Sequence, residues 1–298
     1  MPTKTSFTYV NARLAVKSAG RTLDLLELLS NQRQGLSLAE ISQTLRIPKS
    51  STLQILRTLE AREYVARDGP TNRFRLDVRV FALGRAYAES IDLVRQGQRV
   101  LAELSRELDE TCHLAVLDGL DVVYVAKEES SQPMRMVSAV GRRIPAHATG
   151  VGKMLLAMLD ESGLSARLKG VRLARLTPRT LTAAARLRDE LRTTRARGFA
   201  FDDGESTEGL QCLAAPVMDQ HAQAIAAISA SVPAVRLPAD RVREVLAGVC
   251  EAARRLSRAL GYGGAYRGAL AAHRDDLGEW LKTIRAPSGR RPDTLARR

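Results

Sequence analysis

The sequence predicts an α+β protein of two domains, in which a small helical domain with a β-hairpin precedes a larger domain of helices and antiparallel strands. Two observations predict this division. Residues 14–77 contain short helical segments and one arginine-bearing hairpin, whereas strand-like runs become frequent only from residue 111 onward. The length of 298 residues is sufficient for two domains with at least one well-buried core.

The net charge of +13 is concentrated at the two ends of the chain. Residues 1–90 carry 14 Lys/Arg against 8 Asp/Glu, a net of +6, and residues 265–298 carry 8 against 4, a net of +4. The 174 residues between them are nearly balanced at +3. Basic ends indicate a polyanionic partner, and nucleic acid is favoured over a membrane because no basic helix has a bulky apolar face. A generally arginine-rich proteome is the alternative explanation.

Composition also limits the compartment and the chemistry. No apolar run approaches the ~20 residues that span a bilayer, and the N-terminus lacks the apolar core of a secretory signal. No C-x-x-C occurs, and the histidines lack ligand spacing, so we expect no disulfide framework, no metal and no cofactor. No serine or cysteine has a recognisable nucleophile context, so we expect no enzyme. The protein is predicted to be cytoplasmic and reduced.

The first domain is predicted to contain three helices. A leucine-rich helix begins near Ser18 and ends at residues 31–32. The segment SLAEISQTL opens with Ser37 and Glu40 at the spacing of a capping box. The segment PKSSTLQILRTLEAR follows as a third helix with Pro48 at its start.

The third helix has two faces of different character. Leu53, Leu56 and Leu59 lie on one face. The opposite face is small, polar and basic, and it carries Lys49, Ser50, Gln54 and Arg57, with Ser51 beside them. A short helix, a tight turn and a helix of this kind suit DNA recognition, because such side chains reach base edges while the first turn approaches phosphates. A plain helical bundle is the alternative for this segment taken alone.

A β-hairpin follows in YVARDGPTNRFRL, where Asp68-Gly69-Pro70 interrupts two short β-like runs. It is predicted to form a wing that carries three arginines, Arg67, Arg73 and Arg75. Arginines on a wing are placed for contact with the DNA backbone or the minor groove.

Residues 15–76 resemble the winged helix–turn–helix of IclR-family transcriptional regulators. Two positions depart from the family pattern. Gln54 stands where the family usually has Arg, and because Gln can read adenine with two hydrogen bonds, a different preferred operator is expected. Glu63 stands where Gly is usual. The backbone at Glu63 either keeps the turn that the family has there or continues the third helix by a further turn.

The remaining residues predict a linker and an α+β domain. Asp77 is a candidate N-cap for a linker helix that breaks near residues 90–92. The segment HLAVLDGLDVVYVAKE predicts a hairpin, MRMVSAV alternates as a further strand, and PADRVREVLAGVCEAARRLSRAL is a long amphipathic helix. Helices that flank an antiparallel sheet make an α+β domain. The phrases GRRIPAHATGVGK and GLQCLAAPVMD resemble the effector-binding domain of the IclR family, which implies a GAF/PAS-like fold.

These observations define the expected domain organisation. Residues 14–77 form a winged helix–turn–helix DNA-binding domain and residues 78–91 a linker helix. Residues 92–262 form the effector-binding and oligomerisation domain. Residues 263–298 are a basic C-terminal extension, partly disordered, in which Trp280 could anchor one more helix.

The segment HATGVGK is similar to part of a phosphate-binding loop, which raises the question of whether this domain hydrolyses a nucleotide. The phosphate-binding loop G-x-x-x-x-G-K-[ST] requires Gly at position 147 and Ser or Thr at position 154, where this chain has His147 and Met154. The missing residues would supply the tight turn and a magnesium ligand, so a nucleotide hydrolase is disfavoured. What remains is a helix N-terminus that favours an anion. Alternatively, the glycines allow a helix and the sheet to pack closely.

The family resemblance implies that this loop borders an effector pocket. Gly150 and Val151 would offer backbone donors to a carboxylate, and Ser229 and Ser231 face the same side of one strand. The other implied pocket residues are Asp202 and Cys212, with Met136, Ile144 and Leu210 as an apolar patch.

Other roles are open for these residues. Cys212 could be a small buried hydrophobe, and the two serines could be ordinary strand residues. Asp202 could stabilise a loop together with Asp203. An acidic side chain next to a carboxylate ligand makes sense only if Asp202 accepts a proton from a hydroxyl or water, or is itself protonated.

The resemblance implies a transcriptional regulator, a repressor or an activator, that binds double-stranded DNA at a palindromic operator and senses a small organic acid. It also implies a homodimer or a dimer of dimers, that is, a homotetramer. The alternative is a small-molecule-binding protein or an enzyme without sequence-specific DNA binding, whose basic N-terminus serves assembly. The exposed face of residues 49–62 discriminates between the two hypotheses.

Overall fold

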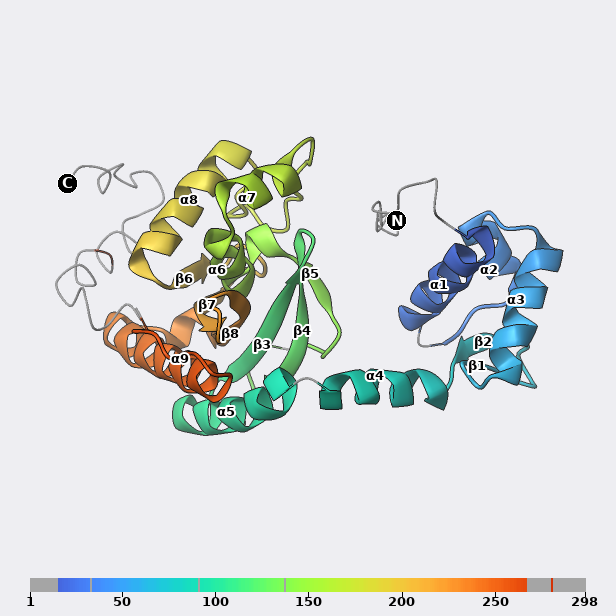
Figure 1. The fold of residues 1–298 in the computed structure, drawn as a ribbon, viewed down its shortest axis with the longest axis horizontal. Helices are drawn as coiled ribbons and strands as arrows, with labels where there is room; N and C mark the ends of the chain where they lie inside the picture. Colours follow the sequence, from blue (N-terminus) through green and yellow to red (C-terminus); the bar gives the residue numbers. More distant parts are fainter. Residues whose placement is uncertain (1–15, 33, 91, 137, 267–279, 281–298) are drawn as a thin grey trace. The chain divides into compact units, whose positions relative to one another are not determined.

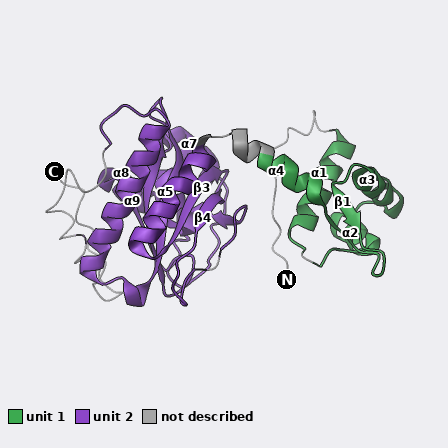
Figure 2. Cartoon of the chain, turned by 90° about the horizontal axis from the view of Figure 1, so that it is seen from below, with its two compact units in different colours: residues 1–90 green, residues 91–298 purple. Residues whose placement is uncertain are grey.

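The computed structural model describes residues 16–266, apart from residues 33, 91 and 137, and also residue 280. The chain divides into two compact units, Met1–Ser90 and Ile91–Arg298 (Figure 2). None of the described helices is both long and apolar enough to cross a membrane.

The first unit contains the predicted helix–turn–helix and hairpin (Figure 1). Its elements are α1 (Lys17–Ser30), α2 (Leu38–Leu45), α3 (Lys49–Ala61), β1 (Val65–Arg67), β2 (Phe74–Leu76) and α4 (Val78–Ser90). The capping box is confirmed, since the Ser37 N–H donates to Glu40 Oε2 at 2.7 Å and Ser37 Oγ accepts from the Glu40 N–H at 3.3 Å. Leu25, Ile41 and Leu56 are fully buried in the centre of this unit.

The buried stripe of α3 differs from the prediction by one position. Thr52, Leu56 and Leu59 are buried, whereas Leu53 is only half-buried. Spacings of four and three residues bring these three side chains onto one face of a helix, and Leu53 lies at the margin of that face. Thr52 fits this interior because its hydroxyl donates to the Pro48 carbonyl at 3.1 Å.

A left-handed residue ends the turn after α3. The helix stops at Ala61, and Glu63 has a φ of 61°, so the alternative of a further helical turn at this position is wrong. The Tyr64 N–H instead reaches back to the Leu59 carbonyl at 2.9 Å. The conformation is one that glycine adopts most readily, which explains why glycine is the residue expected there.

The second unit is built on a six-stranded antiparallel sheet of order β5-β4-β3-β8-β7-β6. The strands are β3 (Thr111–Asp118), β4 (Asp121–Glu128), β5 (Arg143–Pro145), β6 (Ala200–Asp203), β7 (Leu210–Met218) and β8 (Ala224–Pro233). The predicted hairpin is confirmed, with Asp118 opposite Asp121. The strand predicted over residues 134–140 is wrong for the residues described there, because the strand next to β4 is β5. Met134 and Val140 are 63% and 59% exposed, so alternation in this segment does not reflect a buried face.

Helices cover both faces of the sheet (Figure 1). α5 (Asp92–Leu108) and α9 (Ala239–Ala259) pack on one face in one apolar core. α6 (Gly150–Met158), α7 (Glu161–Leu168) and α8 (Ala184–Arg197) form a second core on the other face. Two short 3₁₀ turns, η1 (Ala146–Ala148) and η2 (Ala234–Arg236), complete the unit. The predicted α+β architecture is confirmed.

The Trp280 side chain packs against aromatic residues of the second unit, whereas the helix predicted around it falls on residues outside those described. Its ring meets Phe199 and Phe201 edge to face, with centroids 4.9 and 5.3 Å away. The Arg197 guanidinium lies over the same indole at 5.6 Å. The other predictions for residues 267–279 and 281–298 lie outside the described residues.

Candidate nucleic-acid interface and candidate ligand pocket

The outer face of α3 presents the predicted DNA-contacting side chains. Four of them are exposed, namely Lys49, Ser50, Gln54 and Arg57, and Ser51 is half-buried. The N-cap residue is Pro48, which supplies no side-chain acceptor for the first turn. The N–H groups at the start of α3 are therefore uncapped, as a contact with DNA phosphate requires.

The wing does not bring its three arginines together. Arg67 lies opposite Phe74 and Ala66 lies opposite Arg75, so Arg67 and Arg75 point to opposite faces of the hairpin. Both are exposed. Arg73 is half-buried and holds the hairpin to the helices, since its Nε donates to the Gly35 carbonyl and one Nη donates to Glu40, both at 3.1 Å.

A small cavity of about 10 Å³ lies on the face of the sheet that α6 covers. Such a volume holds about one water molecule. Eight of the nine predicted effector residues line it, namely Met136, Gly150, Val151, Asp202, Leu210, Cys212, Ser229 and Ser231. Ile144 is the exception, because it is buried on β5 away from the lining.

Three further lining residues were not predicted, namely Tyr124, Thr149 and Ser206. Tyr124 carried a usable signal, since it lies on a strand whose residues alternate between buried and half-buried. Thr149 also carried one, because it directly precedes the glycines of HATGVGK. Ser206 follows β6 in an irregular segment, where no periodicity indicates which way a side chain points.

Polar side chains form a row across four neighbouring strands. The register places Asp202 of β6 opposite Cys212 of β7, Cys212 opposite Ser231 of β8, and Ser231 opposite Thr111 of β3. All four residues are buried. Because directly opposed residues point to the same face of a sheet, the row faces α6 as one layer.

Hydrogen bonds continue this row into the interior. The Cys212 thiol donates to Ser231 Oγ at 3.3 Å, and Ser231 Oγ lies 3.4 Å from His113 Nδ1. His113 Nε2 lies 2.7 Å from Ser138 Oγ, and its ring stacks on Tyr124 at 4.4 Å. Burial, and then the charge of Lys127, lower the pKa of His113 to about 3, so the imidazole is neutral. Burial raises the pKa of the Cys212 thiol, which makes it a poor nucleophile.

The first turn of α6 has two N–H groups without an acceptor among the described residues, and both belong to residues that line the cavity. Thr149 Oγ1 accepts the Gly152 N–H at 3.1 Å, and the Thr149 carbonyl accepts the Lys153 N–H at 2.9 Å. Within the described part of the chain, the N–H groups of Gly150 and Val151 have no acceptor. Gly152 has a steric role, because a Cβ there would lie 2.2 Å from the Ala146 carbonyl oxygen. Gly150 is the glycine that lies against the sheet, and a Cβ there would make an ordinary contact of 3.4 Å with Cys212 of β7. The close approach that requires glycine is therefore between α6 and η1, not between the helix and the sheet.

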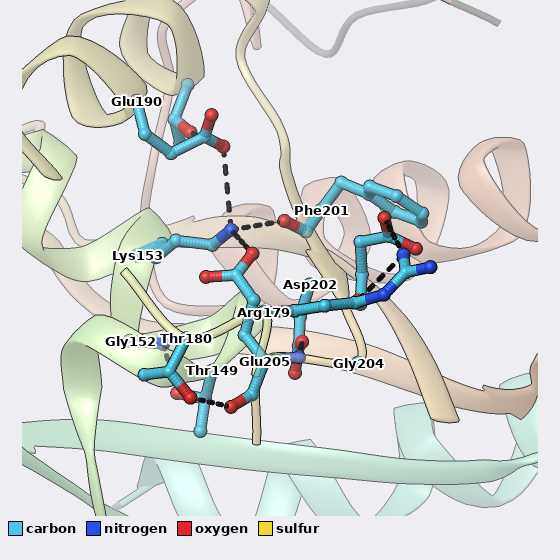
Figure 3. A network of polar contacts seen from close by, with 12 residues as sticks. Thr149, Gly152, Lys153, Arg179, Thr180, Glu190, Phe201, Asp202, Gly204 and Glu205 are labelled. Atoms are coloured by element: carbon cyan, nitrogen blue, oxygen red, sulfur yellow. Dashed lines mark hydrogen bonds and ion pairs between the residues drawn. The ribbon is translucent and has the colours of Figure 1, made fainter. Parts of the chain in front are cut away.

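The side chain of Lys153 is buried in the protein interior (Figure 3). Its side chain is 1% exposed, and its Nζ lies 2.5 Å from both the Phe201 carbonyl and Glu205 Oε1. Glu190 Oε1 is 3.5 Å away. A lysine bound in this way cannot reach a phosphate in solvent, which is a further argument against a nucleotide-binding loop.

Asp202 is the acidic residue of the pocket. It is 2% exposed, and its Oδ1 accepts the Glu205 N–H at 2.7 Å. Burial raises the pKa of this carboxyl to about 7, and Glu205 also raises it, although Lys153 and two backbone N–H groups act in the opposite direction. The pocket therefore combines two unpaired helix donors with a carboxyl that is easily protonated.

The two units define a class of protein, one in which a winged helix–turn–helix precedes an α+β unit with a small polar cavity. Two family models match the corresponding parts of the chain. The IclR helix-turn-helix domain matches residues 18–69, and the C-terminal domain of the bacterial transcriptional regulator IclR matches residues 85–258. The chain belongs to the IclR family of bacterial transcriptional regulators.

Individual relatives agree with this assignment. The HTH-type transcriptional regulator KdgR of Escherichia coli K12 is 36% identical over 248 residues, which cover 83% of this chain and 94% of the relative. The transcriptional repressor IclR of the same organism is 35% identical over 251 residues, covering 84% and 91%. The crystal structure of Thermotoga maritima IclR matches with a TM-score of 0.67 at 27% identity, covering 83% of this chain and 100% of that chain. The protein is a DNA-binding transcriptional regulator and not an enzyme.

Proposed function

We propose that the protein controls a catabolic operon by binding a palindromic operator and by responding to a small organic acid. The exposed polar face of α3 carries this proposal, because it lies within the matched helix–turn–helix and faces away from the core. The regulator acts as a repressor or as an activator, depending on where the operator lies. Since its target is chromosomal DNA, we place the protein in the cytoplasm.

The side chains of α3 divide the work of recognition. Gln54 and Arg57 lie three positions apart on the exposed face and read base edges in the major groove, Gln54 favouring adenine and Arg57 guanine. Lys49, Ser50 and Ser51 surround the uncapped first turn and contact phosphates.

The wing arginines also contact phosphates. Arg67 and Arg75 do so from opposite faces of the hairpin. Arg73 does so through Nη1, the nitrogen that its contacts with Gly35 and Glu40 leave available.

The pocket of the second unit binds the acid. Its carboxylate accepts hydrogen bonds from the N–H groups of Gly150 and Val151, while Ser229 and Ser231 bind the rest of the polar part. Cys212 and Asp202 complete the polar wall, and the aliphatic part of the ligand contacts the apolar residues Met136 and Leu210, with Ile144 behind them. The cavity must expand for this ligand, since about 10 Å³ holds no organic acid.

A palindromic operator requires two copies of the reader, so we propose a homodimer or a dimer of dimers. The ligand works by binding more tightly to one of two relative placements of the DNA readers. A ligand with equal affinity for both placements would shift nothing, however tightly it binds.

The DNA half of the proposal is tested with Gln54→Ala combined with Arg57→Ala. We expect a loss of specific operator affinity of at least about 100-fold, because two base-reading side chains are removed. Operator binding is measured by fluorescence anisotropy at fixed salt, with the DNA upstream of the regulated gene. Arg186→Ala combined with Gln220→Ala removes the same residue types from exposed positions of the second unit and is the matched control. Unchanged operator affinity in the α3 variant would contradict the proposal.

The ligand half is tested with Ser229→Ala combined with Ser231→Ala. We expect weaker binding of small carboxylic acids, because two hydroxyls of the pocket wall are lost, while operator affinity stays unchanged. Isothermal titration calorimetry with acetate, pyruvate and benzoate measures the effect. An undiminished heat signal in the double variant would refute the assignment of the two serines.

A further inference from the structure

The carboxyl group of Asp202 has an unusual position for the wall of an anion site. It is almost completely buried, it lines the same cavity as Gly150 and Val151, and it lies opposite Cys212. Its hydrogen-bond donors are the backbone N–H groups of Glu205 and Ser206. Among the described residues, no Lys or Arg forms an ion pair with it.

The nearest cation is already neutralised. Lys153 Nζ lies 2.5 Å from Glu205 Oε1 and 3.5 Å from Glu190 Oε1 (Figure 3). Glu190 is also bound by Arg197 at 2.9 Å. Lys153 thus already faces two carboxylates before Asp202 is counted. An ionised Asp202 would be a third carboxylate in a buried cluster.

The remaining groups next to Asp202 offer no compensating charge. Cys212 approaches from β7 and Tyr124 from β4, and burial raises the pKa of both, so both stay neutral at ordinary pH. From α6 and α8 the charged groups are Lys153 and Glu190, which are paired as described. A proton on Asp202 avoids a further negative charge beside this buried, already paired lysine.

We propose that Asp202 holds a proton in the ligand-free pocket and donates it in a hydrogen bond to the carboxylate of the ligand, so that the pocket takes up a monocarboxylate only while that proton is present. The inference rests on the proposed ligand pocket. No bond breaks, because the O–H of Asp202 directs its proton to a carboxylate oxygen. An ionised Asp202 would instead repel the ligand at close range.

The proton itself is tested without any ligand, by infrared difference spectroscopy of wild type against Asp202→Asn. At about pH 6, below the raised pKa of Asp202, we expect the carbonyl stretch of a protonated carboxyl in wild type only. The band should disappear at about pH 9. Absence of the band at the lower pH would overturn the proposal, whether or not an acid binds.

The role of the proton is tested by calorimetry with acetate, pyruvate and benzoate in two buffers of different ionisation enthalpy. We expect Kd to rise about tenfold per pH unit above about pH 7, with uptake of about one proton per ligand at the alkaline end. Asp202→Asn keeps a hydrogen-bond donor and should bind with little dependence on pH. A Kd that is independent of pH in wild type would overturn the proposal. If none of the acids binds at any pH, the proposed ligand class fails, while the infrared band still decides on the proton.

Glu205→Gln tests the charge balance. It releases Lys153 to pair with Asp202, which should then lose its proton, so we expect monocarboxylate affinity near pH 7 to fall at least about tenfold. Simple removal of a negative charge predicts the opposite, and a gain in affinity would overturn the assignment. Asp203→Asn is the matched control, because this neighbouring carboxylate pairs with Arg179 and faces the other side of β6. Its pH profile should match wild type.

Discussion

The two units differ in the solvent exposure of the side chains that are assigned to binding. On α3 four of the five side chains assigned to binding are exposed, whereas in the second unit Asp202 and Ser231 are each 2% exposed. An exposed side chain can change without disturbing the fold. A buried polar group must keep a hydrogen-bond partner, so the residues of the pocket are also part of the structure that holds the sheet and α6 together.

The largest expected effect sharpens this difference at Gly152. In Gly152→Ala the added Cβ would lie 2.2 Å from a backbone carbonyl that cannot move cheaply, so we expect a loss of about 3 kcal/mol or more in the unfolding free energy of the second unit. Chemical denaturation followed by the fluorescence of Trp280, the single tryptophan, measures it. In Gly150→Ala the nearest contact is an ordinary 3.4 Å, and equal destabilisation by both variants would contradict the steric explanation.

The wing should show a smaller effect on DNA affinity. Arg67→Ala and Arg75→Ala should each weaken binding to every sequence alike and reduce the slope of log K against log salt by about one. Arg73→Ala should also lower the melting temperature of the first unit, because it removes the contacts with Gly35 and Glu40. Salt titrations measure the phosphate contacts of all three arginines, and calorimetric melts measure the structural role that is expected only of Arg73. An unchanged melting temperature in Arg73→Ala would show that Arg73 does not stabilise the first unit.

Stability of the second unit should fall as pH rises through the range in which Asp202 loses its proton. Burial raises the pKa of this carboxyl from 3.8 to about 7. Its contribution to the unfolding free energy is therefore fully present below about pH 4 and is lost as pH rises toward and through 7. Between about pH 6 and pH 8 the loss amounts to about 1 kcal/mol. Denaturation of wild type and Asp202→Asn across this range measures the difference, and parallel pH profiles would rule the contribution out.

The smallest expected effect concerns Glu63. In Glu63→Gly the left-handed φ of 61° costs glycine nothing, so we expect a gain of about 0.5 kcal/mol in the first unit. The exposed ion pair with Arg79, at 3.9 Å, offsets little of this gain. Urea denaturation monitored by circular dichroism provides the measurement. A loss of stability would mean that the Glu63 side chain contributes more than its geometry indicates.

Sequence reasoning was most successful where local chemistry determines structure. The capping box at Ser37 and Glu40 and the hairpin after α3 follow from neighbouring residues alone. On α3 the prediction placed Leu53 on the buried face with Leu56 and Leu59, whereas the structure buries Thr52. The threonine can be buried because its hydroxyl donates to the carbonyl of the N-cap residue Pro48, a compensation that a hydrophobicity pattern does not record.

The pocket was predictable in part. Family resemblance indicated most of its lining, but the network behind it depends on residues far apart in sequence. Lys153 had the features of a phosphate-binding lysine, and its pairing with Glu205 across 52 positions was not predicted. A lysine inside the apolar run after HATGVG is a usable signal that such a partner exists, since a buried ammonium requires one.

The alternation of β8 has a consequence for how such a regulator could acquire a new specificity. Ser229 and Ser231 face the pocket, whereas Ile228, Ala230 and Val232 belong to the core shared with α5 and α9. Substitutions at every second position therefore alter the chemistry of the pocket without removing an atom from that core. One side of β8 can therefore change with the ligand, while the other side maintains the fold.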